Sequence, residues 1–166
     1  THKVMGNWVN SGAFDPSTST VRLIGTTNQT VASSTFDKLI VNNPAGVTLT
    51  GDVSVTGTLT LASGNLNTGG YVLTMNNSSP SALTLGSNQI FGTISRSIAP
   101  GSTGTYELFS TNAFIIPNGT NNPTSITATA YPNSNPPNLA PGADTNMIAK
   151  RFYTITQTGV GSGFSF

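Results

Sequence analysis

The sequence predicts an all-β protein that consists of a short β-solenoid followed by a small β-sandwich, and three observations lead to this. Apolar residues alternate with small hydroxyl residues along short runs, as at 47–50, 53–56 and 58–61. Each run ends at Gly, Asn or Asp, residues that turn a chain readily. The runs also recur too closely for helical crossovers to lie between them. Short strands joined by tight turns are therefore expected throughout the first half.

The spacing of these strands, from about residue 21 to about residue 85, fits either a β-solenoid or a meander of hairpins. Two details favour the solenoid. The residues expected to face inward are nearly all Val, Leu and Ile, as a narrow stacked core requires. Gly64 and Asn65 also stand at an expected corner, where left-handed backbone is easily adopted. A sandwich of hairpins stays open as the alternative for this half.

Aromatic residues and prolines become frequent after Pro80, which indicates a second domain. Four strands are expected there, at 89–98, 104–109, 125–131 and 151–157. Longer aromatic strands joined by longer loops are typical of a small β-sandwich. We therefore predict a solenoid-like domain over residues 1–80 and a sandwich-like domain over residues 81–166, with the boundary between 78 and 88.

Several segments share a distinctive order of short strands and turns. They lie at 6–8, 21–25, 36–43, 53–61, 64–66, 92–96 and 150–155. This series resembles a repeat of secreted β-helix and β-sandwich surface proteins of Bacteroidota and related bacteria. The resemblance implies a right-handed stack followed by a sandwich, an adhesin-like or sheath role, and export by a type IX system. In that family the sandwich normally continues by another strand or two, whereas this sequence stops at Phe166.

Composition limits the function classes that are open to the chain. Charged residues make up 7% of it, against about 25% in an average soluble protein. The six basic and five acidic residues are scattered singly, so we expect no binding of nucleic acid. No apolar run approaches the roughly 20 residues that span a bilayer, and we expect no membrane insertion.

The absence of cysteine excludes disulfides and thiolate metal sites, and it fits a secreted bacterial protein. We therefore expect an extracellular or cell-surface location in a bacterium. The sequence opens at Thr1 and shows no signal peptide. We accordingly expect either a processed chain or a piece of a longer one.

Catalytic side chains are scarce. The acids are Asp15, Asp37, Asp52, Glu107 and Asp144. An enzyme on a β-helix would need two or three clustered carboxylates to cleave polysaccharide, but Asp15 and Asp52 stand at expected turns. Asp37 and the adjacent Lys38 are expected on opposite faces of a strand. His2 is the single imidazole, so a Ser/His/Asp triad would depend on it.

We therefore predict no catalytic residues, no cofactor and no metal site. A degenerate polysaccharide-active enzyme is kept as a third alternative, and it would need Asp15, Asp37 or Asp52. Two pairs of hydroxyls, Thr48 with Thr50 and Thr58 with Thr60, raise the possibility of an ice-binding face. We interpret them as ordinary exposed strand residues, because two pairs are few for such a face.

The predicted fold has open ends, and natural solenoids cap their ends to stay soluble. We predict a structural subunit of an extracellular filament or surface sheath, with copies of itself as partners. The copies would join through open β edges, by strand complementation. The predicted subunit interface contains Val4, Trp8, Phe164 and Phe166. Trp8 is also interpreted as a plug over the first turn of the stack.

The alternative is an adhesin fragment that binds surface glycans through loops of the second domain. A Pro- and Asn-rich segment at 132–144 supports this hypothesis, because long loops often carry binding sites. The predicted ligand residues are Tyr131, Asn133, Asn135 and Asn138. Filaments of the purified chain would favour the first hypothesis, and a monomer that binds a glycan array would favour the second.

Overall fold

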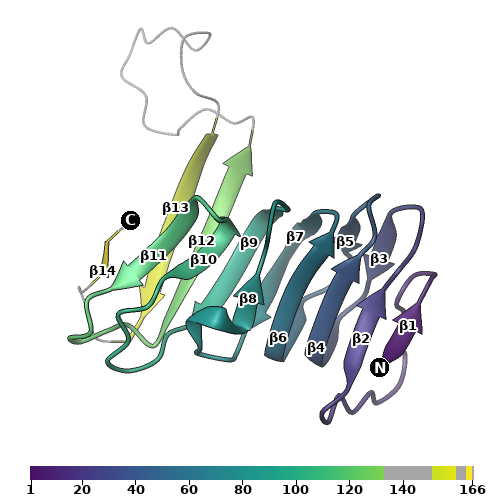
Figure 1. The fold of residues 1–166 in the computed structure, drawn as a ribbon, viewed down its shortest axis with the longest axis horizontal. Helices are drawn as coiled ribbons and strands as arrows, with labels where there is room; N and C mark the ends of the chain where they lie inside the picture. The colour runs from purple at the N-terminus through teal and green to yellow at the C-terminus, as the bar shows by residue number, and fades with distance from the viewer. Residues whose placement is uncertain (133–150, 160–163, 166) are drawn as a thin grey trace, which may run out of the picture.

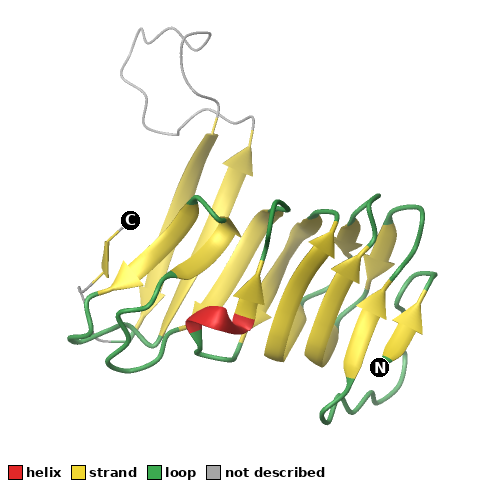
Figure 2. Cartoon of the chain, viewed as in Figure 1, coloured by secondary structure: helices red, strands yellow, loops and turns green. Residues whose placement is uncertain are grey.

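The computed structural model describes residues 1–132, 151–159 and 164–165. In its first part the chain winds into a β-solenoid of about five turns (Figures 1 and 2). The strands of this part are β1 (His2–Val4), β2 (Thr20–Leu23), β3 (Gln29–Val31), β4 (Ser34–Asn42), β5 (Val47–Leu49), β6 (Val53–Ser63), β7 (Leu66–Met75), β8 (Leu83–Thr84) and β9 (Ile90–Ser97). They pair in parallel. Hairpins would have paired antiparallel, so the prediction of an all-β solenoid is confirmed.

The solenoid has three faces. The first contains β1, β2, β8 and the second halves of β4 and β6. The second contains β3, β5 and the starts of β7 and β9. The third contains the first halves of β4 and β6 and the second halves of β7 and β9. The longer strands therefore bend from one face to the next, and their register shifts at the bends.

Inward residues form columns that run along the stack. Leu59 is in register with Leu39 on one side and with Leu83 on the other. Val53 and Leu73 form part of a second column, and all five side chains are buried. Each turn thus buries the apolar face of its neighbour, which stabilises the stack by roughly 25 cal/mol for each Å² removed from water.

A buried polar corner joins the first face to the second. The Asn43 side chain donates to the carbonyl of Thr27 at 2.7 Å and to Oε1 of Gln29 at 3.0 Å. Its own oxygen accepts from the backbone N–H of Ala45 at 3.0 Å. Because buried amides are costly unless their donors and acceptors are satisfied, this network keeps the corner in one conformation.

The bend in β7 depends on glycine. Gly69 and Gly70 both have positive φ, the region in which a side chain is unfavourable. A Cβ on Gly69 would also lie 2.5 Å from the carbonyl oxygen of Leu49 in the preceding turn. The chain therefore turns between two faces at a place where neighbouring turns approach too closely for a side chain.

The second part is a two-sheet sandwich that grows out of the last turn. Its other elements are the 3₁₀ helix η1 (Pro80–Ala82), which precedes β8, and the strands β10 (Tyr106–Ser110), β11 (Ala113–Pro117), β12 (Ser125–Pro132), β13 (Arg151–Thr158) and β14 (Phe164–Ser165). One sheet continues from β9 through β12 to β13 by antiparallel pairing, and the other has the order β10–β11–β14. Phe109 of β10 stacks on Tyr153 of β13, with ring centroids 5.3 Å apart, so the two sheets pack together.

The solenoid extends beyond residue 80, because its fifth turn contains β8 and β9. The change in composition on which the predicted boundary rests concerns aromatics and prolines, whereas Leu83, Leu85 and Ile90 continue the aliphatic columns and are buried. All four strands predicted in this half are present: the predictions at 89–98, 104–109, 125–131 and 151–157 correspond to β9, β10, β12 and β13. β11 was not predicted, because its apolar residues are consecutive and do not alternate.

The orientation predicted for the Asp37 and Lys38 side chains is wrong. They were expected on opposite faces of a strand, but β4 has a register shift at this point. Both residues lie between the buried Phe36 and Leu39, and the Lys38 Nζ is 2.7 Å from Oδ2 of Asp37. The irregularity places two successive side chains on the outside, where they form an ion pair.

Truncating a column should destabilise the whole stack. We expect Leu59→Ala to lower the free energy of unfolding by about 2–5 kcal/mol, because it leaves a cavity between two turns. The neighbouring Thr60 projects outward, and Thr60→Ala should cost less than about 1 kcal/mol. Urea denaturation followed by circular dichroism measures both, and equal losses would contradict the column arrangement.

Candidate functional site

The N-terminal end of the solenoid is closed by aromatic side chains. Trp8 contacts Phe14 edge to face, with centroids 5.0 Å apart, and lies 5.2 Å from the ring of Phe36. Its indole N–H donates to Oγ of Ser34 at 2.8 Å, and its backbone bridges to Val31. Trp8 thus lies over the end of the core, so much of its surface is already used within its own chain.

Val4 is held in a similar way. It is half-buried, and its carbonyl accepts hydrogen bonds from the backbone N–H of Ile24 at 2.8 Å and from Nε2 of Gln29 at 3.1 Å. Gln29 is itself buried, and its Oε1 accepts from the N–H of Gly25 at 2.7 Å. Val4 and Trp8 therefore belong to the closure of the first turn. Their predicted role at a subunit interface stays a prediction.

The most exposed large apolar side chains of this end are Met5 and Val9, at 73% and 77% exposure. Sequence reasoning missed both. Each directly follows one of the predicted interface residues, and alternation along an extended chain places neighbours on opposite sides. The alternation could have identified both residues, because if Val4 and Trp8 face the core, then Met5 and Val9 face solvent.

The far end of the solenoid is closed by a buried arginine. Arg96 follows Phe36, Val55 and Met75 in one inward column, and it is fully buried. Burial lowers the pKa of Arg96 to about 10, while the nearby Tyr106 and Glu107 act in the opposite direction. The group stays cationic at neutral pH.

The guanidinium of Arg96 connects the solenoid to the sandwich. It donates to the carbonyl of Glu107 at 2.7 Å and to those of Ser79 and Pro80 at 3.1 and 3.2 Å. It also lies over the ring of Tyr106, 5.1 Å from the centroid. Charge-assisted bonds to three carbonyls in two segments suit a planar donor with several N–H groups. The spacing Ile94, Arg96, Ile98 signals an inward arginine, although no role was predicted for it.

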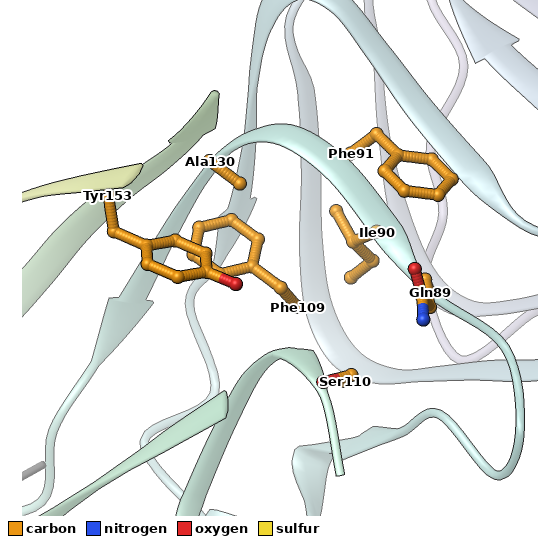
Figure 3. A pocket seen from close by; sticks show the side chains of 7 residues that line it. All are labelled: Gln89, Ile90, Phe91, Phe109, Ser110, Ala130 and Tyr153. Carbon is orange, nitrogen blue, oxygen red and sulfur yellow. The ribbon is translucent and has the colours of Figure 1, made fainter. Parts of the chain in front are cut away.

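Two hollows lie between the sheets of the sandwich. Figure 3 shows the smaller one, where the rings of Phe109 and Tyr153 face each other near Ala130. Its volume is about 20 Å³, which is room for a single water molecule. The larger is an open cleft of about 210 Å³ between β10, β11 and β13. It is lined by Leu108, Phe109, Asn112, Ala113, Phe114, Tyr153 and Ile155.

The predicted ligand loop is only partly within the described residues. Asn133, Asn135, Asn138 and the predicted interface residue Phe166 lie outside them. Phe164 lies in β14, where its backbone pairs with Pro117. Tyr131 is 38% exposed and stacks on Phe152, with ring centroids 4.4 Å apart and planes 11° from parallel. These two rings form an aromatic pair near the end of β12 and the start of β13.

Hydroxyl side chains form a row across the third face. The row runs through six neighbouring strands and contains Thr35, Ser54, Thr74, Ser95, Thr127 and Thr156. A parallel row contains Thr93, Thr129 and Thr154. Thr127 donates to Ser95 at 3.0 Å, and the hydroxyls of Thr93 and Thr129 are 2.9 Å apart. Part of their hydrogen-bonding capacity is thus used within the sheet.

The threonine pairs noted in the sequence do not contribute to this row. Thr48 is on the second face, in register with Thr30 and Asn67. Thr58 and Thr60 are on the first face, in register with Lys38 and Ile40. Thr48 therefore lies on a different face from Thr58 and Thr60, and Lys38 and Ile40 interrupt the rows that contain Thr58 and Thr60.

The described acids are dispersed. Asp15 accepts from the N–H of Ser17, and Asp52 accepts from the N–H of Val72 in the next turn, both at 2.9 Å. Asp37 pairs with Lys38, and Asp144 lies outside the described residues. Among the residues that the structure describes, no three His, Asp or Glu side chains are grouped so that they could hold a metal ion. The described part also contains no helix with the length and apolar character to cross a membrane.

No protein family, curated protein or solved structure matched the chain in our comparisons.

Replacing the buried Arg96 should weaken the connection between the solenoid and the sandwich. We expect Arg96→Leu to lower the free energy of unfolding by at least about 3 kcal/mol, because several buried carbonyls lose a charged donor. Arg22 on β2 is only half-buried, and Arg22→Leu is the matched control, with an expected change within about 1 kcal/mol. Thermal and urea unfolding measure both, and an equal effect of the two changes would refute the role of Arg96.

Proposed function

We propose that the chain is a non-enzymatic structural subunit of an extracellular bacterial filament or surface sheath, built from copies of itself. The observation that carries this proposal is the continuous path of hydrogen-bonded strands from β1 to β13. Among the described residues, each of these two terminal strands pairs with a single neighbour, β2 or β12. An edge strand presents unpaired N–H and C=O groups that can pair with another chain.

The two ends differ from each other, which favours an open assembly over a closed dimer. β1 belongs to a parallel stack, whereas β13 belongs to an antiparallel sheet. A contact between unlike surfaces is heterologous, and repetition of such a contact produces a ring or a filament. Strand complementation between copies would supply the backbone hydrogen bonds.

The surface and the scarcity of catalytic groups support the same proposal. The hydroxyl rows on the third face carry no charge, so copies can pack against them without burying an ion. Asp15, Asp37 and Asp52 each take part in a local structural contact. The extracellular bacterial location rests on the resemblance and on the lack of cysteine.

Purified chain should form regular filaments. We expect electron microscopy to show fibres with a constant axial repeat, and sedimentation to show assembly that depends on protein concentration. Because backbone and apolar contacts carry the assembly, it should persist at about 1 M NaCl, where the Debye length is about 3 Å. A chain that stays strictly monomeric at all concentrations would refute the proposal.

A second candidate function is glycan binding, and the aromatic pair of Tyr131 and Phe152 favours it. Exposed rings offer flat apolar faces that can stack on other planar or apolar surfaces. The pair lies where β12 and β13 approach the predicted loop. In this alternative the chain is a fragment of an adhesin, and the solenoid serves as its support.

Glycan binding can be tested by a matched pair of substitutions. If the aromatic pair binds sugars, Tyr131→Ala should abolish glycan-array signals by removing one stacked ring. Tyr71 has a similar exposure, 41% against 38%, but lies on the solenoid, so Tyr71→Ala should leave binding unchanged. No array signal from the unmodified chain, or equal loss in both variants, would rule out this site.

A further inference from the structure

We infer that each copy of the chain inserts the side chains of Met5 and Val9 into the apolar cleft between β10, β11 and β13 of the next copy. This inference rests on the proposed self-assembly and deepens it, because it names the contact between subunits. The Met5 and Val9 side chains are called the knob below, and the seven residues that line the larger hollow are called the cleft.

The two side chains of the knob are the most exposed large apolar groups among the described residues. Met5 and Val9 are 73% and 77% exposed, whereas the other exposed large apolar residues reach only 36–42%. Both side chains belong to the first turn of the solenoid. Their neighbours Val4 and Trp8 are held against the core, so the knob can enter a partner without disturbing the closure of its own solenoid.

The cleft has the size and chemistry to receive the knob. Its volume is about 210 Å³, and a buried apolar cavity of about 150 Å³ is large enough to bind benzene. None of its seven lining residues is charged, and six of them present carbon-rich side chains. Two aliphatic side chains can therefore enter it without leaving a charge buried and unpaired.

The positions of knob and cleft decide what kind of assembly results. Figure 1 shows β1 at one end of the molecule and β10, β11 and β13 at the other. A copy whose cleft is filled by a neighbour still presents its own knob at the opposite end. An apolar projection and a complementary pocket at different places on one molecule make a heterologous contact, which repeats along a fibre unless it closes into a ring.

The knob explains assembly better than the interface residues predicted from sequence. Removing Val4 from its own stack would break two hydrogen bonds to its carbonyl, one of them from the buried Gln29. Removing Trp8 would uncover Phe36 and break its bond to Ser34. Inserting Met5 and Val9 into a partner breaks none of these contacts.

The test uses the full chain and three variants. Met5→Asp with Val9→Asp removes the knob, and Ala113→Trp fills the cleft. Tyr71→Asp is the control, because it places a single aspartate on an exposed aromatic position outside both surfaces. We expect the first two variants to raise the concentration needed for assembly by at least about 100-fold, and the control to assemble like the unmodified chain. Circular dichroism and thermal unfolding check that each variant folds.

A mixing experiment gives the sharper result. The knob variant keeps an intact cleft, and the cleft variant keeps an intact knob. Each alone should sediment as a monomer, while an equimolar mixture should form a heterodimer and stop there, because no free knob–cleft pair remains. Long polymers in the mixture, or no dimer at all, would overturn the inference.

The outcomes separate this inference from the proposed function. If the unmodified chain forms filaments and the knob variant forms them equally well, the inference is wrong and self-assembly through other edges stands. If the unmodified chain stays monomeric, self-assembly itself is wrong. Should an aspartate or tryptophan variant fail to fold, Met5→Gln with Val9→Thr and Phe114→Ser take their places and are judged by the same outcomes.

Discussion

Parallel stacking of turns is the constraint on which the rest of this structure depends. A turn of a solenoid cannot bury its apolar residues alone, and only the turns above and below it cover them. The columns through Leu39, Leu59 and Leu83 are the direct result. In the described stack, the first and the last turn each have a neighbouring turn on one side only. Several features outside the columns cover the exposed side of these end turns.

The two ends are closed by different means. At the first turn, the rings of Trp8 and Phe14 lie against Phe36, the first residue of its column. At the last turn, the same column ends in Arg96, whose two terminal guanidinium nitrogens donate to backbone carbonyls and whose cation lies over the ring of Tyr106. An apolar closure needs only enough apolar surface to cover the end of the core. A buried cation instead needs fixed acceptors, and it therefore holds the segments that supply them in one arrangement.

In the proposed filament this difference gives each copy a direction, because the two ends of the molecule are unlike. One end displays a parallel strand and exposed aliphatic side chains, and the other displays an antiparallel edge and an apolar cleft. Unlike ends favour head-to-tail contacts over symmetric pairs. The low charge of the chain also suits the proposed assembly, since neighbouring copies would bring few like charges together.

The sequence by itself determined the all-β class, the stack of short strands and the aliphatic columns, because alternation and turn residues are local signals. It also indicated where β9, β12 and β13 lie. Only the tertiary structure decided that the sheet passes without a break from the solenoid into the sandwich, since pairing between distant strands leaves no local pattern. It likewise decided that the Asp37 and Lys38 side chains share one side, through a register shift. The candidate contact shows the same division: alternation could have marked Met5 and Val9 as exposed, but the cleft is made by strands far apart in the chain and exists only once they have packed.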